Sequence, residues 1–190
     1  MLLLVHAMMV DGRSLDRPNG PAAFFASAGW EVWVPDLRGR GLSGPTVAEG
    51  ADWSYDDLVR FDLPALVAAA QENSGPCWVV GNSLGGHVSA AAAGTGAYAQ
   101  PPDGHVFFSV NAWVAGLEPS WWMRVRKGLG SWFFGFAARV FGRLPARALR
   151  IGPVDEAATY AADIHRFWTH GWGSRDGVDY LASLACVKTP

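Results

Sequence analysis

Residues 77–93 read CWVVGNSLGGHVSAAAA, and this stretch decides the fold. It begins with an apolar run at 77–80, which predicts a buried strand, and ends in small residues that predict a closely packed helix. Between them lies the pentapeptide 81–85, with the pattern G-x-S-x-G. A strand that turns directly into a helix puts Ser83 at the apex of a strained turn, with its hydroxyl clear of the sheet. Glycine is expected at both ends of the pentapeptide because the helix and strand backbones pass too closely for a Cβ atom.

Two further motifs precede the pentapeptide, each at the end of a predicted strand. The first strand ends in His6-Ala7-Met8, and the second leads into DLRGRGLSG at residues 36–44. The complete pattern predicts strands near 2–6, 31–35, 77–82 and 105–110, and helices near 21–29, 55–71 and 84–95. Alternation of this kind predicts an α/β fold: a parallel sheet of about four strands with helices on both faces.

With these motifs in this order, the chain resembles the α/β-hydrolase superfamily. The matching features are His6-Ala7 in place of a strand-ending His-Gly, the loop D-x-R-G-x-G-x-S at 36–43, and the elbow at Ser83. More narrowly, the chain is similar to the esterase, lipase and serine-aminopeptidase-like hydrolases that carry a helical cap. The resemblance covers nearly the whole chain, and it implies a partial α/β-hydrolase fold. The strand-ending motifs imply the spatial order second, first, third, fourth.

The resemblance implies hydrolysis of an ester, thioester or amide through an acyl-enzyme on Ser83, without a cofactor. The oxyanion that forms in such a reaction needs fixed hydrogen-bond donors. In this fold the donors are the backbone N–H after the nucleophile, here Leu84, and one from the loop after the first visible strand, here Met8. Ala7 stands where the family usually has glycine, and this exchange leaves the amide in place. The expected partner is a small-molecule substrate with an apolar acyl part.

The general base is an open question, because each of the five histidines has an expected structural role. His6 matches the family's histidine that braces the oxyanion loop. His87 is expected to pack within the elbow helix, and His105 opens a predicted strand. His165 and His170 lie in the cap, where surface or aromatic packing is favoured over a place above the nucleophile.

The acidic partner of a base is also missing from the sequence. Asn111 follows the fourth strand, where some family members carry the triad acid, but an amide cannot balance an imidazolium charge. Asp36 is expected to anchor its own loop. The chain looks truncated at both ends, and residues 187–190 resemble the approach to the strand that precedes the family's catalytic acid and histidine. The alternatives to an active enzyme are therefore an incomplete fragment or non-catalytic remnant, and a fragment completed by a second polypeptide.

From Trp113 onward the strand pattern stops, and the sequence predicts helices without strands. We expect one domain over 1–190, with a core at 1–112 and a helical cap at about 113–187. Several of the Trp and Phe side chains of the cap are expected to face the Ser83 pocket. Residues 120–150 contain seven basic residues, seven Trp or Phe and no acidic residue. For this segment we favour an amphipathic arrangement, in which the aromatic side chains pack on the core and the arginines face water. The alternative is a lid that admits acyl chains or touches an anionic lipid surface.

Composition argues against several other classes of protein. The chain has 190 residues, of which 50% are apolar and 17% charged, so we expect a folded domain. A net charge of −2 and the absence of a matching fold argue against nucleic-acid binding. No metal-ligand spacing or phosphate-binding loop is present. Cys77 and Cys186 are expected to be free, buried thiols. Without a signal-peptide pattern or a run of about 18 apolar residues, the sequence predicts a soluble, cytoplasmic protein without stable membrane insertion.

Overall fold

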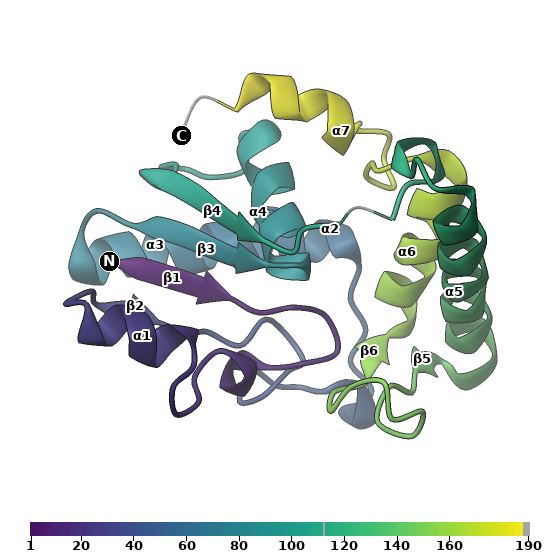
Figure 1. The fold of residues 1–190 in the computed structure, drawn as a ribbon, viewed down its shortest axis with the longest axis horizontal. Coiled ribbons are helices and arrows are strands. Elements are labelled where there is room, and N and C mark those ends of the chain that lie inside the picture. Colours follow the sequence, from purple (N-terminus) through teal and green to yellow (C-terminus); the bar gives the residue numbers. More distant parts are fainter. Residues whose placement is uncertain (112, 188–190) are drawn as a thin grey trace.

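The computed structural model describes residues 1–111 and 113–187 of the chain. At its centre lies a parallel sheet of four strands, β1 (Leu2–Val5), β2 (Val32–Trp33), β3 (Trp78–Asn82) and β4 (Gly104–Phe108). The strands lie in the order β2-β1-β3-β4 (Figure 1), which confirms the predicted order. β1 pairs with β3 along its whole length, from Leu2 opposite Trp78 to Val5 opposite Gly81. The predicted approach to a further strand covers residues 187–190, of which 188–190 lie outside the described residues.

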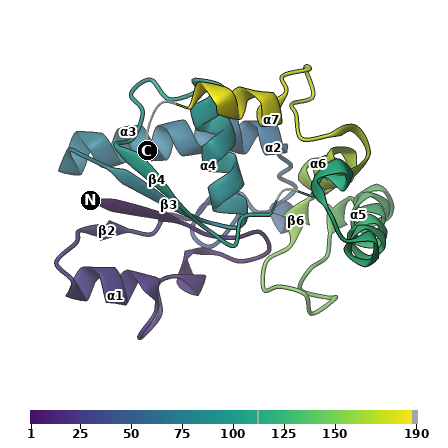
Figure 2. The same cartoon turned by 45° about the horizontal axis from the view of Figure 1, so that its top comes forward.

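Helices cover both faces of this sheet, as the α/β pattern predicts. α1 (Pro21–Ser27) lies on one face, while α3 (Leu63–Ser74) and α4 (Leu84–Gly94) lie on the other (Figure 2). Alternate residues of β1 point to opposite faces. Leu3 therefore belongs to the larger apolar cluster with α3 and α4, and Leu4 to a smaller cluster under α1. The site at the ends of the strands thus rests on a sheet that is packed on both sides.

The predicted helix at 55–71 has an irregular centre. It begins with α2 (Tyr55–Asp57), continues as a π-helical turn at Leu58–Asp62 and ends as α3. Ser54 caps its first turn in a capping box with Asp57. Pro64 has no N–H for a regular helical ladder, so the π turn lies directly before it. The Asp62 carboxylate does not cap α3, because it accepts the backbone N–H and the Nε–H of Arg38, at 3.1 and 2.7 Å.

The region after residue 112 lies beside the carboxyl ends of the strands. It contains α5 (Trp121–Phe141) and α6 (Ala158–His170), which pack against each other with α5 outermost (Figure 1). The prediction of helices without strands is wrong here, because β5 (Arg143–Leu144) and β6 (Glu156–Ala157) form an antiparallel pair. This pair is separate from the main sheet, to which residues 113–187 add no strand.

The last described helix returns to the core. α7 (Tyr180–Ser183) packs on α4, where a Cβ on Gly94 would lie 2.6 Å from the Ser183 hydroxyl oxygen. The division into a core at 1–112 and a cap at about 113–187 stays a prediction. Both cysteines are free, but only Cys77 is buried, whereas Cys186 is exposed. In the described ranges, no helix combines the length and apolar character needed to cross a bilayer.

Candidate active site

Ser83 occupies the turn between β3 and α4. Its backbone has φ 51° and ψ −107°, in a region that residues with a side chain rarely adopt. The Ser83 amide donates to the carbonyl of Phe108 at 2.9 Å, which ties the turn to the end of β4. The strained strand–turn–helix geometry predicted for this serine is therefore present, with Ser83 at the carboxyl end of the third strand.

The two glycines of the pentapeptide make this turn possible. A Cβ on Gly81 would lie 2.4 Å from the Cα of Gly86, and a Cβ on Gly85 would lie 2.4 Å from the carbonyl oxygen of Val5. Both distances are far below van der Waals contact. The close approach of helix and strand that was expected from the sequence is confirmed.

The two backbone amides expected to bind an oxyanion lie at the same end of the sheet. Leu84 is the first residue of α4, where a helix has an N–H without an internal acceptor and a partial positive charge. Met8 lies in the turn after β1. The amide of Gly85 donates to the carbonyl of His6 at 3.2 Å, so the elbow and the loop after β1 are joined directly. Within the described residues, neither the Met8 nor the Leu84 amide donates to another protein group.

His6 braces this loop, as the resemblance implied. Its Nε2 accepts the backbone N–H of Leu37 at 3.1 Å, so Nδ1 carries the proton and donates to the carbonyl of Ala7 at 2.8 Å. Burial lowers the pKa of His6 to about 4, which keeps the ring neutral. Both ring nitrogens are occupied by the backbone, and neither is available to Ser83.

Asp36 anchors the loop at 36–44. One carboxylate oxygen accepts the Gly12 N–H at 2.7 Å, and the other accepts the Leu42 N–H at 2.8 Å. The carboxylate therefore connects its own loop to the segment that follows Met8. This matches the anchoring role expected from the sequence.

Glu156 is a residue of this region that the sequence analysis missed. Its Oε1 accepts the Met9 N–H at 2.5 Å, and its Oε2 forms a salt bridge with Arg40 at 2.5 Å. The side chains of Glu156 and Arg40 are fully buried. The Val154 N–H donates to the Met9 carbonyl at 3.1 Å, so residues 154–156 hold both backbone polar groups of Met9. No sequence pattern indicated this pair, because the burial of Arg40, which makes an acidic partner necessary, is set by tertiary packing.

The core histidines have other partners. His87 Nδ1 forms a hydrogen bond of 2.9 Å with the Tyr55 hydroxyl, which also accepts the indole N–H of Trp172 at 3.1 Å. Burial lowers the pKa of His87 to about 4, so this ring is also neutral. His105 Nδ1 forms a hydrogen bond of 2.9 Å with the Ser89 hydroxyl. His87 fills the packing role expected for it, and His105 lies at the start of β4, as predicted.

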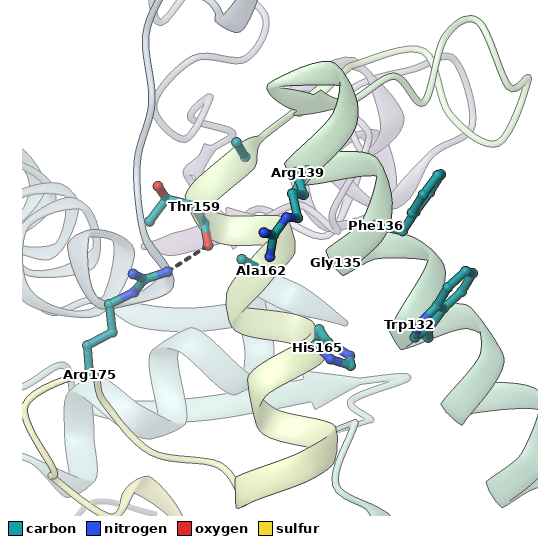
Figure 3. A pocket seen from close by; sticks show the side chains of 10 residues that line it. Trp132, Gly135, Phe136, Arg139, Thr159, Ala162, His165 and Arg175 are labelled. Atoms are coloured by element: carbon teal, nitrogen blue, oxygen red, sulfur yellow. Dashed lines mark hydrogen bonds between the residues drawn. The ribbon is translucent and has the colours of Figure 1, made fainter.

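The cap histidines do not form hydrogen bonds with Ser83 either. His165 points toward α5, where a Cβ on Gly135 would lie 3.0 Å from its ring (Figure 3). It lines a pocket of about 590 Å³ between α5 and α6, to which Ser83 does not contribute. His170 Nδ1 contacts the Thr169 hydroxyl at 2.7 Å on the surface. The favoured packing roles match this arrangement.

Asn111 does not orient a histidine. Its side-chain oxygen accepts the Lys127 ammonium at 3.0 Å, and Lys127 also pairs with Glu118. This cluster joins α5 to the chain just after β4. In the part of the chain that the structure describes, no group of His, Cys, Asp and Glu side chains is arranged to hold a metal ion.

The aromatic residues of the cap divide into two groups. Trp113 and Phe134 stack at 5.5 Å and join the large apolar cluster that contains Leu84. Trp132 and Phe136 stack at 5.4 Å and line the pocket between α5 and α6. The second group is not among the several cap aromatics expected to face Ser83, because Ser83 does not line this pocket.

Comparison with known proteins agrees with this geometry. The sequence model of the family described as "Serine aminopeptidase, S33" matches residues 3–170, which include the elbow, both motif loops and the cap through α6. The chain belongs to this family. As an S33 family member it has a partial α/β-hydrolase fold, and the resemblance inferred from its motifs is confirmed.

Curated relatives of this S33 chain match only a part of it. Lipase lipl-1 of Caenorhabditis elegans is 36% identical over 80 residues, covering 37% of this chain and 20% of the lipase. Lipase member M of Mus musculus is 31% identical over 96 residues, covering 45% of this chain and 23% of that protein. The matches thus span about a fifth of the length of these relatives.

Two solved structures extend over the whole S33 chain. One comes from LipS and LipT, two metagenome-derived lipolytic enzymes, with a TM-score of 0.61, 19% identity, and coverage of 100% of this chain and 68% of the other. The second is the monoacylglycerol lipase of Paleococcus ferrophilus, with a TM-score of 0.54, 14% identity, and coverage of 100% and 70%. At these identities, the likeness establishes the fold.

Proposed function

We propose that this S33 chain is a carboxylic-ester hydrolase in which Ser83 forms the acyl-enzyme. The observation that carries the proposal is the backbone of Ser83 itself, with φ 51° between β3 and α4. Strain of this kind persists only where the surrounding structure imposes it, and it concentrates at active sites. Here the strain is imposed by the close packing of α4 on the strands. Gly81 and Gly85 make this packing possible, because a side chain at either position would block the approach of the backbones.

The proposed reaction has two steps. The Ser83 hydroxyl oxygen attacks the ester carbonyl carbon, and the carbonyl electrons move onto oxygen, where the Leu84 and Met8 amides stabilise the charge. Return of these electrons expels the alcohol, which leaves with the serine proton. Water then attacks the acyl carbon, its oxygen stays on the departing acid, and one of its protons passes to the Ser83 oxygen. The positive end of α4 favours the anionic intermediates of both steps.

The proposed substrate is a small ester with an apolar acyl part. Its chemical class is supported by the names of the curated relatives, which are lipases. An apolar acyl part is supported by the residues around the expected oxyanion site. Met8, Met9 and Trp113 are partly buried and pack on the cluster that includes Leu84.

We expect the chain of residues 1–190 to be a slow enzyme by itself. All five histidines lie within the described residues, and none of them forms a hydrogen bond with Ser83. Serine hydrolases that lack triad members retain some catalysis from the oxyanion donors and from substrate binding. A slow reaction that still depends on Ser83 is therefore the expected behaviour.

Turnover of a short-chain aryl ester tests the proposal. The wild-type chain should hydrolyse the ester slowly, and Ser83→Ala should abolish the enzyme-dependent rate. Ser27→Ala, at an exposed serine of α1, is the matched control and should leave the rate unchanged. Equal rates for wild type and Ser83→Ala would reject the proposal. A fast, Ser83-dependent rate would reject the expectation of slowness and indicate that His165 or His170 serves as the base.

A further inference from the structure

The outer face of α5 is apolar and exposed. Its exposed apolar side chains have between 44% and 72% of their surface accessible. They are Trp121, Trp122, Val125, Leu129, Trp132, Phe136, Val140 and Phe141. From the sequence, the Trp and Phe side chains of residues 120–150 were expected to pack on the core. This prediction is wrong for five of the seven, which are exposed. The buried side of α5 is instead made of Lys127, Ser131, Phe134, Ala137 and Ala138.

All of these exposed side chains except Phe141 form one continuous stripe. At 3.6 residues per turn, these seven positions fall within an arc of roughly 100°, on the side opposite the buried residues. α5 is the outermost helix of the cap in both views of the fold (Figures 1 and 2), with α6 between it and the sheet. Within the described residues, no other element covers the stripe.

Positive charge borders the stripe. Residues 119–154 contain no Asp or Glu. Arg124 and Arg126 are exposed and lie on either side of the stripe, and Arg139 is exposed near its far end. Lys127 does not add to this surface, because it is turned inward to Glu118. The outer face of α5 is therefore both apolar and cationic.

A cation also lies beside the aromatic pair of the stripe. Trp132 and Phe136 lie on the outer side of α5, whereas Arg139 points toward α6 (Figure 3). All three line the pocket of about 590 Å³ between the two helices. A ligand that placed an anionic group beside Arg139 in this pocket would bring its apolar part into contact with the rings of Trp132 and Phe136. An anionic lipid, with its charged headgroup joined to acyl chains, has this arrangement.

We infer that the outer face of α5 docks the protein on an anionic lipid surface. Helices that lie in a bilayer interface combine a Trp-, Phe- and Leu-rich face with flanking basic residues. Each basic residue gains free energy near the negative surface. A second copy of the chain fits this surface less well, because two basic faces without acidic residues would repel each other. Docking is peripheral, because α5 is not apolar enough to span a bilayer.

The inference is independent of the proposed function, because it requires no catalytic residue. It is tested by co-sedimentation of the full chain with vesicles of pure phosphatidylcholine and with mixed vesicles of phosphatidylcholine and phosphatidylglycerol. The protein should bind the mixed vesicles at low salt, bind pure phosphatidylcholine at least tenfold more weakly, and be released from the mixed vesicles at high salt.

Two pairs of variants locate the surface. Arg126→Glu should weaken binding to the mixed vesicles about 30-fold, because it changes the charge near the membrane by two units. Trp132→Ala should weaken binding about tenfold through loss of inserted apolar surface. Their controls are Arg17→Glu and Trp30→Ala, two exposed positions outside the cap, which should bind like wild type. Circular dichroism should show that all four variants are folded.

Three outcomes would overturn the inference. The first is equal binding to both kinds of vesicle, which would show that the arginines do not contribute to binding through the negative charge of the lipid. The second is an equal effect of a cap variant and its control, which would locate binding elsewhere. The third is a dimer in analytical ultracentrifugation that Trp132→Ala dissociates and that does not bind vesicles, which would make the stripe an interface between copies of the chain.

Discussion

The carboxylate of Glu156 accepts the backbone N–H of Met9 at 2.5 Å, although 147 positions separate the two residues in the sequence. Glu156 belongs to β6, and Met9 follows the residue expected to donate the second oxyanion hydrogen bond. Met9 has φ 60°, a left-handed conformation that requires support. Burial raises the pKa of Glu156, whereas Arg40 and the Met9 amide favour its ionised form. β6 therefore holds the backbone of the loop after β1 through one buried ion pair.

Replacement of Glu156 by Gln is expected to destabilise the protein by about 3–5 kcal/mol, because it leaves the fully buried Arg40 without a counter-charge. Urea unfolding at neutral pH measures this loss. The double variant Arg40→Met/Glu156→Leu removes both charges and should recover most of the stability, since apolar replacements of buried ion pairs are often neutral or stabilising.

The same double variant separates stability from positioning. It removes the acceptor of the Met9 N–H, so Ser83 should react with a fluorophosphonate more slowly than in wild type, at similar stability. A double variant that is stable and labelled at the wild-type rate would show that Glu156 does not position the oxyanion loop.

Gly85→Ala should destabilise the fold by more than about 3 kcal/mol, because its Cβ would lie 2.4 Å from the Val5 carbonyl oxygen. Gly116→Ala is the matched control, because a Cβ there meets no atom within 4 Å. Thermal unfolding of both variants compares the two positions. A small and equal effect of the two substitutions would contradict the close approach of α4 and β1.

Ser83→Gly is expected to stabilise the protein by about 1 kcal/mol and to abolish its reaction with esters. Glycine adopts φ 51° without strain, and this gain exceeds the extra entropy of glycine in the unfolded chain. Ser83→Ala removes the hydroxyl but keeps the strain, so it should not share the gain. Chemical denaturation of the three proteins measures the difference, and a Ser83→Gly variant less stable than Ser83→Ala would show that the turn is not strained.

Stability should fall as the pH is lowered from about 6.5 toward 4. Burial lowers the pKa of both His6 and His87 from 6.5 to about 4. Within this window the unfolded chain binds protons that the folded chain does not, so the stabilisation is complete above pH 6.5 and is lost as the pH falls to about 4. The loss is up to about 3 kcal/mol for each histidine.

Urea unfolding between pH 7 and pH 4 checks this dependence. His87→Gln should flatten the pH profile, because it removes one of the histidines whose pKa is lowered by burial. His170→Gln, at an exposed histidine, is the control and should keep the wild-type slope. A profile that is level over this range in the wild-type protein would show that the two rings are not buried.

The place of Ser83 could be predicted because its signal is local, whereas the strand order was implied by the resemblance that the three strand-ending motifs carry. An apolar run, a G-x-S-x-G turn and a small-residue helix occur within 17 consecutive residues, and the spacing itself imposes the elbow. The anchoring role of Asp36 could be predicted for the same reason, since its hydrogen-bond partner Leu42 lies in the same loop. The two-residue strands β5 and β6 could not be predicted, because so short a segment shows no alternation.

Two other features depend on tertiary packing and lie outside the reach of sequence patterns. Nothing in the sequence selects Glu156 from among 17 acidic residues as the partner of Arg40, which is 116 positions away. In α5 the many apolar residues predict a buried face but do not say which side is buried. Gly128 and Gly135 let α5 approach Trp168 and His165 of α6 closely, so small residues turn inward and the large aromatics turn outward.

The most direct test of the central claim is to identify the residue that a fluorophosphonate modifies in the intact chain. The wild-type protein should gain one phosphonyl group, and mass spectrometry of its proteolytic peptides should place this group on Ser83. Ser83→Ala should remain unmodified under the same conditions, whereas Ser27→Ala should be labelled like wild type. A phosphonyl group on any other residue, or equal labelling of Ser83→Ala, would contradict the assignment of Ser83 as the nucleophile.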